Sequence, residues 1–233
     1  MRVSIMQPYF FPYIGYLQLL QSSDIFVVYD DVAFINKGWI NRNRILANGA
    51  ASMFTIPLKN ASQNRLINEI EIDWNGKWET KFLKTLEQNH KKSPHFQVGF
   101  ELISNLLQPK HQQLSELILE SLKLFKNIFE LNAEIIPSSI VFENNELKAQ
   151  DRILDIVKKV GGNTYINAIG GKELYLKEDF EKQGVELKFL ETQIEAYPQN
   201  APTSISHLSI LDLLMNVSIA DIKTQLNNYQ LID

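Results

Sequence analysis

The pattern of apolar and polar positions predicts strands that alternate with helices along most of the chain. Residues 2–6 and 24–29 are short apolar runs, and the second is continuous, as in a strand buried on both faces. Between them, residues 13–21 place apolar side chains at helical spacing. Strand, loop, helix and strand is the order of a parallel α/β unit.

The same alternation continues towards the C-terminus. Further strands are expected at residues 52–58, 67–73, 135–142, 164–168 and 185–190, and further helices at residues 77–90, 94–107, 112–131, 147–160, 174–183, 208–217 and 218–228. The segment 76–132 is a candidate helical insert. We therefore predict a single α/β domain over residues 1–233, with a mostly parallel sheet, flanking helices and a Rossmann-like N-terminal half.

Composition narrows the classes of function. A chain of 233 residues that is 45% hydrophobic can bury a substantial core. A net charge of -4 without a basic block argues against a nucleic-acid binder. The lack of cysteine excludes disulfides and thiolate nucleophiles and suits the cytoplasm. No apolar run approaches the ~20 residues that span a bilayer, and prolines interrupt the first run, so neither an integral membrane segment nor a signal peptide is expected.

In open α/β sheets ligands bind beyond the carboxyl ends of the strands, and three predicted loops lie there. The first loop, residues 7–15, is rigid because it contains two prolines. The candidate ligand-binding residues of this loop and of the helix start that follows it are Gln7, Tyr9, Tyr13, Gly15 and Tyr16. The tyrosines would stack on or hydrogen-bond a base or sugar, and the glycine would let a ligand approach the backbone. The alternative is that these aromatic rings only pack the start of the first helix.

The second loop, residues 30–44, begins with two acids. Asp30 and Asp31 are the candidate catalytic bases, because adjacent carboxylates in a cleft can have displaced pKa values. Neighbouring side chains on an extended strand point to opposite faces, so at most one of the two is expected in a pocket. The other candidate residues are Trp39, Asn41, Arg42, Asn43, Arg44 and, from the following polar loop, Lys59. The arginines would clamp phosphate or carboxylate groups. The alternative is that Asp30 and Asp31 only cap a turn and that the asparagines and arginines only form a solvated rim.

The third loop, residues 167–175, contains Gly170 and Gly171 before a predicted helix and ends at Tyr175. The free N–H groups of that helix could hold an anion, although a glycine pair is also typical of a plain turn.

The four histidines show no metal-ligand spacing, so no metal site is predicted. The sequence identifies neither a cofactor nor an oligomeric state.

Several segments together resemble the WbqC-like protein family. They are QPYFFPYIGY, DIFVVYDDVAFINKGWINRNRI, FTIPLKN, GGNTYINAIGGKELYL, VELKFLE and LSILDLLMNV, in the same order along nearly the whole chain. This resemblance implies a cytoplasmic bacterial enzyme associated with surface-polysaccharide and O-antigen gene clusters, acting on sugar-linked intermediates. It does not imply a particular reaction.

The N-terminal half is also similar, more distantly, to nucleotidyltransferase-like α/β proteins, whose H-x-G-H motif grips ATP phosphates. The segment Tyr13-Ile14-Gly15-Tyr16 occupies that place with both histidines replaced, which speaks against adenylyl transfer. We therefore expect a transferase of acyl or aminoacyl type whose small-molecule substrate is a nucleotide-sugar, a sugar-linked intermediate or an acyl donor. The alternative is a non-catalytic sugar-nucleotide-binding or assembly protein, which the absence of histidine and cysteine among the candidates favours.

Overall fold

The computed structural model, which describes residues 1–108 and 110–233, confirms the α/β fold. Its main sheet has six strands in the order β10-β9-β8-β1-β2-β7. These strands are β1 Arg2–Met6, β2 Ile25–Val28, β7 Glu134–Ile136, β8 Thr164–Ala168, β9 Glu186–Thr192 and β10 Tyr229–Ile232. Neighbouring strands pair in parallel, except that β10 runs antiparallel to β9 at the sheet edge.

Helices cover both faces of this sheet. The helices are α1 Ile14–Ser22, α2 Trp78–His90, α3 Phe96–Leu107, α4 Leu114–Phe129, α5 Ala149–Lys159, α6 Lys177–Lys182, α7 Ile210–Asn216 and α8 Ile219–Gln225, of which α1 and α5 lie on opposite faces of the sheet. Side chains alternate along β2: Phe26 and Val28 belong to the core that contains α1, and Val27 belongs to the core that contains α5. The continuous apolar run of β2 is therefore buried on both faces, as its sequence predicts.

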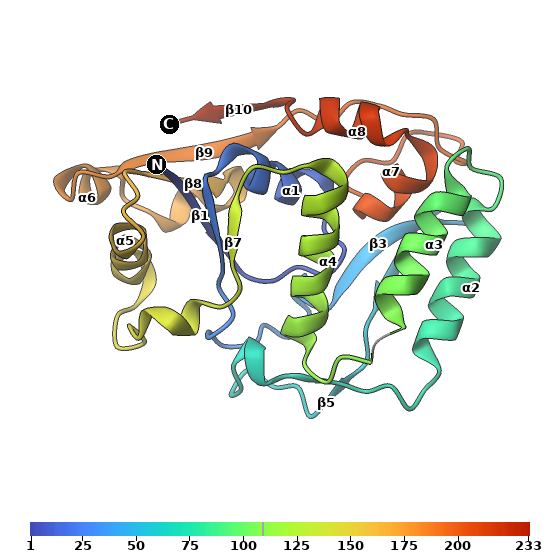
Figure 1. Cartoon of the computed structure of the whole chain (residues 1–233), viewed down its shortest axis with the longest axis horizontal. Coiled ribbons are helices and arrows are strands. Elements are labelled where there is room, and N and C mark those ends of the chain that lie inside the picture. The colour runs from blue at the N-terminus through green and yellow to red at the C-terminus, as the bar shows by residue number, and fades with distance from the viewer. Residues whose placement is uncertain (109) are drawn as a thin grey trace.

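The middle of the chain forms the expected helical stretch. Figure 1 shows α2, α3 and α4 in green on one side of the molecule, with α5 and α6 on the other side. The apolar stripe of α4 faces inwards, since Leu117, Leu122 and Phe125 are fully buried.

Two short antiparallel pairs lie outside the main sheet. β3 Arg42–Ala47 pairs with β4 Ala50–Thr55, and β5 Leu58–Lys59 pairs with β6 Glu71–Ile72. The turn between β3 and β4 is Asn48-Gly49, in which both residues have positive φ, 53° and 74°. This is the backbone that a two-residue hairpin turn requires. The end of the predicted loop 30–44 is thus a strand, because the hairpin pairs its polar residues.

Other elements differ from the sequence prediction in length. The strand expected at 135–142 stops after Ile136, because Pro137 has no N–H to continue the ladder, and a 3₁₀ turn over Ser139–Phe142 follows. The expected strand 67–73 is a 3₁₀ turn over Ile67–Glu69 followed by the short β6. The helix expected from residue 174 begins only at Lys177, after a 3₁₀ segment over Ile169–Leu174.

Candidate functional site

A pocket lies at the point where the strand order of the sheet reverses. From β1 the chain continues to β2 on one side, whereas β8 lies on the other side of β1. Ligands of open α/β sheets bind in the crevice beyond the strand ends at such a point. Met6 at the end of β1 and Ala168 at the end of β8 both line this pocket, which has a volume of about 430 Å³.

Aromatic side chains form the walls of this cavity, which we call the aromatic pocket. It is lined by Met6, Gln7, Pro8, Tyr9, Tyr13, Tyr16, Leu19, Ile35, Gly38, Trp39, Ile40 and Ala168. The ring of Tyr9 contacts the other three aromatic rings of the lining, with its centroid 6.5 Å from that of Tyr13, 5.8 Å from that of Tyr16 and 6.1 Å from that of Trp39. The structure therefore brings Gln7 and the three candidate tyrosines of the first loop together with Trp39 of the second, whereas Gly15 does not line the pocket.

The first loop divides its aromatic residues between the core and the pocket. Phe10 and Phe11 are fully buried in the main core, so these two rings serve packing and do not face the pocket. Tyr9 and Tyr13 are partly buried and line the pocket. The Phe10 amide donates a 3.0 Å hydrogen bond to the carbonyl of Ile40, which holds the tyrosine loop beside the loop that carries Trp39.

The three pocket tyrosines are neutral phenols. Burial raises the pKa of Tyr9, Tyr13 and Tyr16 above the ordinary value of 10. The hydroxyl of Tyr16 donates a 2.8 Å hydrogen bond to the backbone carbonyl of Gln7. At Tyr13 the neighbouring Thr192 side chain opposes the rise in pKa that burial causes. The hydroxyls of Tyr9 and Tyr13 can donate hydrogen bonds to a ligand, whereas that of Tyr16 already donates to Gln7. None of the three supplies a phenolate base near pH 7.

Gly15 lies at the start of α1, where the helix packs closely against β9. A Cβ on Gly15 would lie 2.4 Å from Thr192 Oγ1 and 2.4 Å from the ring of Tyr13. The groups that approach this backbone in the structure are therefore protein side chains. The glycine is required for that packing.

The asparagines and arginines of the second loop alternate in burial. Asn41 and Asn43 are buried and donate to the backbone carbonyls of Ile56 at 2.9 Å and Phe11 at 2.6 Å. Arg42 and Arg44 are half-buried, and their guanidinium carbons lie 5.8 Å and 6.0 Å from the centre of the Trp39 ring. The arginines thus lie beside Trp39, which is one wall of the aromatic pocket, although neither arginine lines the pocket itself, and the asparagines fix the backbone.

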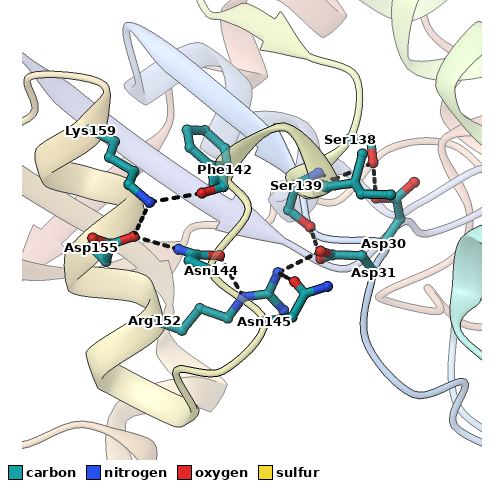
Figure 2. A network of polar contacts seen from close by, with 11 residues as sticks. Asp30, Asp31, Ser138, Ser139, Phe142, Asn144, Asn145, Arg152, Asp155 and Lys159 are labelled. Atoms are coloured by element: carbon teal, nitrogen blue, oxygen red, sulfur yellow. Dashed lines mark hydrogen bonds and ion pairs between the residues drawn. The ribbon is translucent and has the colours of Figure 1, made fainter.

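Asp30 and Asp31 lie outside the aromatic pocket. Figure 2 shows both carboxylates in a network of polar contacts with the segment after β7 and with α5. Asp30 accepts from Ser138 Oγ at 2.6 Å, and Asp31 accepts from Ser139 Oγ and from Arg152 Nη2, the latter at 2.5 Å. Burial raises the pKa of Asp30, and the bond from Ser138 opposes this effect.

The network continues along α5. Arg152 Nε donates to Asn144 at 2.9 Å, Asn144 donates to Asp155 at 2.7 Å, and Lys159 pairs with Asp155 at 2.9 Å. These contacts hold the loops after β2 and β7 against α5. The sequence gives no signal for this network beyond the acids themselves, because Arg152 reads as one polar position of an amphipathic helix.

The remaining candidate residues also lie outside the aromatic pocket. Lys59 forms an exposed ion pair with Glu71 at 3.3 Å. Gly170 and Gly171 belong to the 3₁₀ segment after β8, and the hydroxyl of Tyr175 lies 3.2 Å from that of Tyr165.

Within residues 1–108 and 110–233, no group of three or more His, Cys, Asp or Glu side chains could hold a metal ion. No helix in the same residues is long and apolar enough to cross a membrane.

Comparison with known proteins gives a family and one named relative. A family model described as the WbqC-like protein family matches residues 7–224. The chain is 24% identical over 219 residues to the uncharacterized protein Rv1507c of Mycobacterium tuberculosis, an alignment that covers 93% of this chain and 94% of the relative. No solved structure matches the chain significantly. The family match includes the tyrosines and Trp39 of the aromatic pocket.

Proposed function

The chain belongs to the WbqC-like protein family, and we propose that it is a cytoplasmic transferase of surface-polysaccharide biosynthesis whose substrate is a nucleotide-sugar or a sugar-linked intermediate. The observation that supports this proposal is the position and lining of the aromatic pocket. It lies in the crevice between β1 and β8, where the topology of the sheet favours a ligand.

The lining of the pocket suits a flat or ring-shaped group. Tyr9 and Trp39 offer ring faces, and the apolar faces of sugars and bases stack on such rings. The apolar side chains deeper in the cavity, such as Leu19 and Ile40, suit the acyl or aminoacyl group of a transfer reaction. The cavity volume of about 430 Å³ accommodates a ring together with a short substituent.

A specific observation favours a second function, non-catalytic binding of a sugar nucleotide. The residues that line the aromatic pocket, in the part of the chain that the structure describes, include no acid, histidine or lysine. Asp30 and Asp31, the candidate bases, make their contacts to Ser138, Ser139 and Arg152 instead. A transferase with this site would depend on positioning and on hydrogen bonds from the tyrosines more than on a general base.

Native mass spectrometry of the protein against a panel of sugar nucleotides and acyl donors tests the binding step. We expect a complex with at least one of them, which Trp39→Ala weakens because it removes a pocket wall. Met53→Ala is the matched control, because Met53 is 47% exposed, as is Trp39, but does not line the aromatic pocket. A complex that Trp39→Ala and Met53→Ala affect equally would place the ligand elsewhere.

Asp30→Asn and Asp31→Asn separate the two functions. If the transferase uses either acid as a base, the surface polysaccharide of cells that carry the variant should change in composition while the purified protein keeps its melting temperature and still binds the ligand. If both variants leave the composition and ligand affinity unchanged, the catalytic assignment of these acids is wrong. Mass analysis of the ligands after incubation with the wild-type protein then decides between transfer and binding alone.

A further inference from the structure

Two arginines, Arg42 and Arg44, lie beside Trp39 at the edge of the aromatic pocket, which we call its rim. Arg42 Nε donates to the carbonyl of Gly38 at 2.8 Å, and Arg44 Nη2 donates to the carbonyl of His207 at 3.2 Å. Neither arginine forms an ion pair with an acid of the described residues, although the chain has a net charge of -4. Arginine beside an apolar wall is a frequent arrangement for binding phosphate or carboxylate.

One donor of this rim has no acceptor. Arg44 Nε is buried and makes no hydrogen bond in the described part of the chain. A buried N–H group without an acceptor is costly, and an anionic oxygen is the strongest acceptor that an arginine can receive. The charge of Arg44 also acts on the pocket itself, because it opposes the rise that burial causes in the pKa of Tyr9.

His207 lies at the same rim, on the segment that precedes α7. Its imidazole is exposed, and the ring centroid lies 5.6 Å from that of Tyr13. Its backbone has φ 57°, in the left-handed region, where residues other than glycine are uncommon. Two hydrogen bonds fix this segment to Arg44. The Arg44 side chain donates to the carbonyl of His207, and the amide of Ser209 donates to the carbonyl of Arg44 at 2.8 Å. A strained residue held in this way beside a pocket points to a role for its side chain.

We propose that Arg42, Arg44 and His207 form an anion-binding rim on the aromatic pocket, and that the ligand of this pocket carries a phosphate or carboxylate group next to its ring. This inference rests on the proposed function for the ring-binding cavity and adds His207 as the residue that determines specificity. The tyrosine and tryptophan rings contact the flat group, and the three basic side chains contact the anion. The imidazole donates an N–H to an anionic oxygen, and the guanidinium groups supply the charge.

Three simple ligands separate the contributions of ring and anion. Phenyl phosphate carries both groups, benzoate carries a ring with a carboxylate, and phenol carries a ring that is uncharged near pH 7. By isothermal titration at low salt, we expect the better of the two anions to bind at least tenfold more tightly than phenol. The order of phenyl phosphate and benzoate identifies which anion the rim prefers. Arg44→Gln should remove most of the difference between the anions and phenol.

His207→Asn tests the new residue. Asparagine tolerates the left-handed backbone and keeps the carbonyl that Arg44 needs, so only the imidazole is lost. We expect a severalfold weaker binding of the preferred anion and unchanged binding of phenol. His111→Asn is the matched control, because His111 does not line the aromatic pocket and its backbone carbonyl bonds Trp74. His207→Gly, which relieves the backbone strain, provides a second variant if melting temperature shows that His207→Asn is poorly folded.

The outcomes distinguish this inference from the function on which it rests. Equal affinity of the wild-type protein for the anions and phenol would overturn the rim while leaving a ring-binding pocket. Anion binding that His207→Asn and His111→Asn weaken equally would exclude His207 from the rim. Failure of the wild-type protein to bind any of the three ligands would count against the aromatic pocket as a binding site, and so against both proposals.

Discussion

The side-chain amide of Asn43 donates a 2.6 Å hydrogen bond to the backbone carbonyl of Phe11. The hydroxyl of Ser209 donates to the same carbonyl at 2.7 Å. Phe11 has φ 43°, a left-handed conformation that is unfavourable for a bulky residue. These two bonds therefore hold the tyrosine loop in a shape that its own sequence does not favour. The Asn43 bond connects the loop to the strand that carries Arg42 and Arg44, and the Ser209 bond connects it to the start of α7.

Asn43→Ala should lower both stability and affinity for ligands of the aromatic pocket. We expect a loss of about 1–3 kcal/mol in the free energy of unfolding, measured in urea, because a buried amide-to-carbonyl bond is removed. Affinity for phenyl phosphate should fall as the loop relaxes. Asn41→Ala is the control, since Asn41 makes an equivalent buried bond to the carbonyl of Ile56. A similar loss of stability with an equal loss of affinity in both variants would contradict the special role of Asn43.

Asp31→Ala should destabilise the protein strongly. The Arg152 side chain is only 5% exposed, and Asp31 is its carboxylate partner. Removing one partner of a buried ion pair leaves an uncompensated charge and costs about 3–5 kcal/mol. The double variant Asp31→Ala with Arg152→Met should recover part of this loss, because it removes both charges. If Asp31→Ala is as stable as the wild type, the network of Figure 2 is not a structural clamp.

Gly15→Ala should lower the melting temperature and disturb Tyr13. The added methyl group would overlap both the ring of Tyr13 and Thr192 Oγ1, and overpacking of this kind costs about 1–3 kcal/mol. Adding Thr192→Ala should recover part of the loss. Gly76→Ala is the control, because nothing lies within 4 Å of a Cβ built there. Equal melting temperatures for the two glycine variants would show that the start of α1 tolerates the shift.

The fold could be predicted from the sequence to the extent that local pattern determines it. The continuous apolar run of β2 and the helical spacing of α1 identify a parallel α/β unit, and the rule for such sheets then places the tyrosine loop at the crevice. The position of the aromatic pocket follows from these local features. The hairpin of β3 and β4 has a local signal too, Asn48-Gly49, but the polar residues before it suggest a loop.

The contacts of the acids could not be predicted because they are non-local. Asp30 and Asp31 have the same sequence signal whether they face a ligand or face Ser138, Ser139 and Arg152, all more than a hundred residues away. Periodicity reports which face of an element is buried, and it does not report which loop packs against that face. The apolar members of the pocket wall, such as Leu19 and Ile40, were missed for a related reason, since they look like ordinary core positions.

Trp39→Ala should change affinity far more than stability. Trp39 is 47% exposed and forms one wall of the aromatic pocket, so its truncation removes little buried area. We expect a loss below about 1 kcal/mol in the free energy of unfolding and at least a tenfold loss of affinity for phenyl phosphate. Trp78→Ala gives the contrast, because the Trp78 ring is partly buried against the core and stacks on that of Phe82 at 4.9 Å, so its loss should cost about 2 kcal/mol or more. An unfolded Trp39→Ala would show that this ring is a structural plug.

A buried pair between α2 and α7 should give opposite pH dependences in two single variants. His90 Nε2 lies 3.8 Å from Asp212 Oδ1, both side chains are fully buried, and Tyr197 donates a 2.7 Å hydrogen bond to Asp212. Burial lowers the pKa of His90 from 6.5 to about 4 and raises the pKa of Asp212 from 3.8 to about 6. The unfolded state binds the extra proton at the histidine, whereas the folded state binds it at the aspartic acid.

A group that binds its proton more tightly in one state stabilises that state as pH falls, and this determines how stability depends on pH for His90 and for Asp212. The histidine makes stability rise as pH rises from about 4 to 6.5, and the aspartic acid makes stability fall as pH rises from 3.8 to about 6. Each effect is on the order of 3 kcal/mol, so the two largely cancel in the wild type. The free energy of unfolding of Asp212→Asn, which keeps only the histidine, should therefore increase as pH rises from about 4 to 6.5. That of His90→Gln, which keeps only the aspartic acid, should decrease as pH rises from about 4 to 6. Urea unfolding at several pH values measures both slopes, and slopes of the same sign would show that the pair does not titrate in this way.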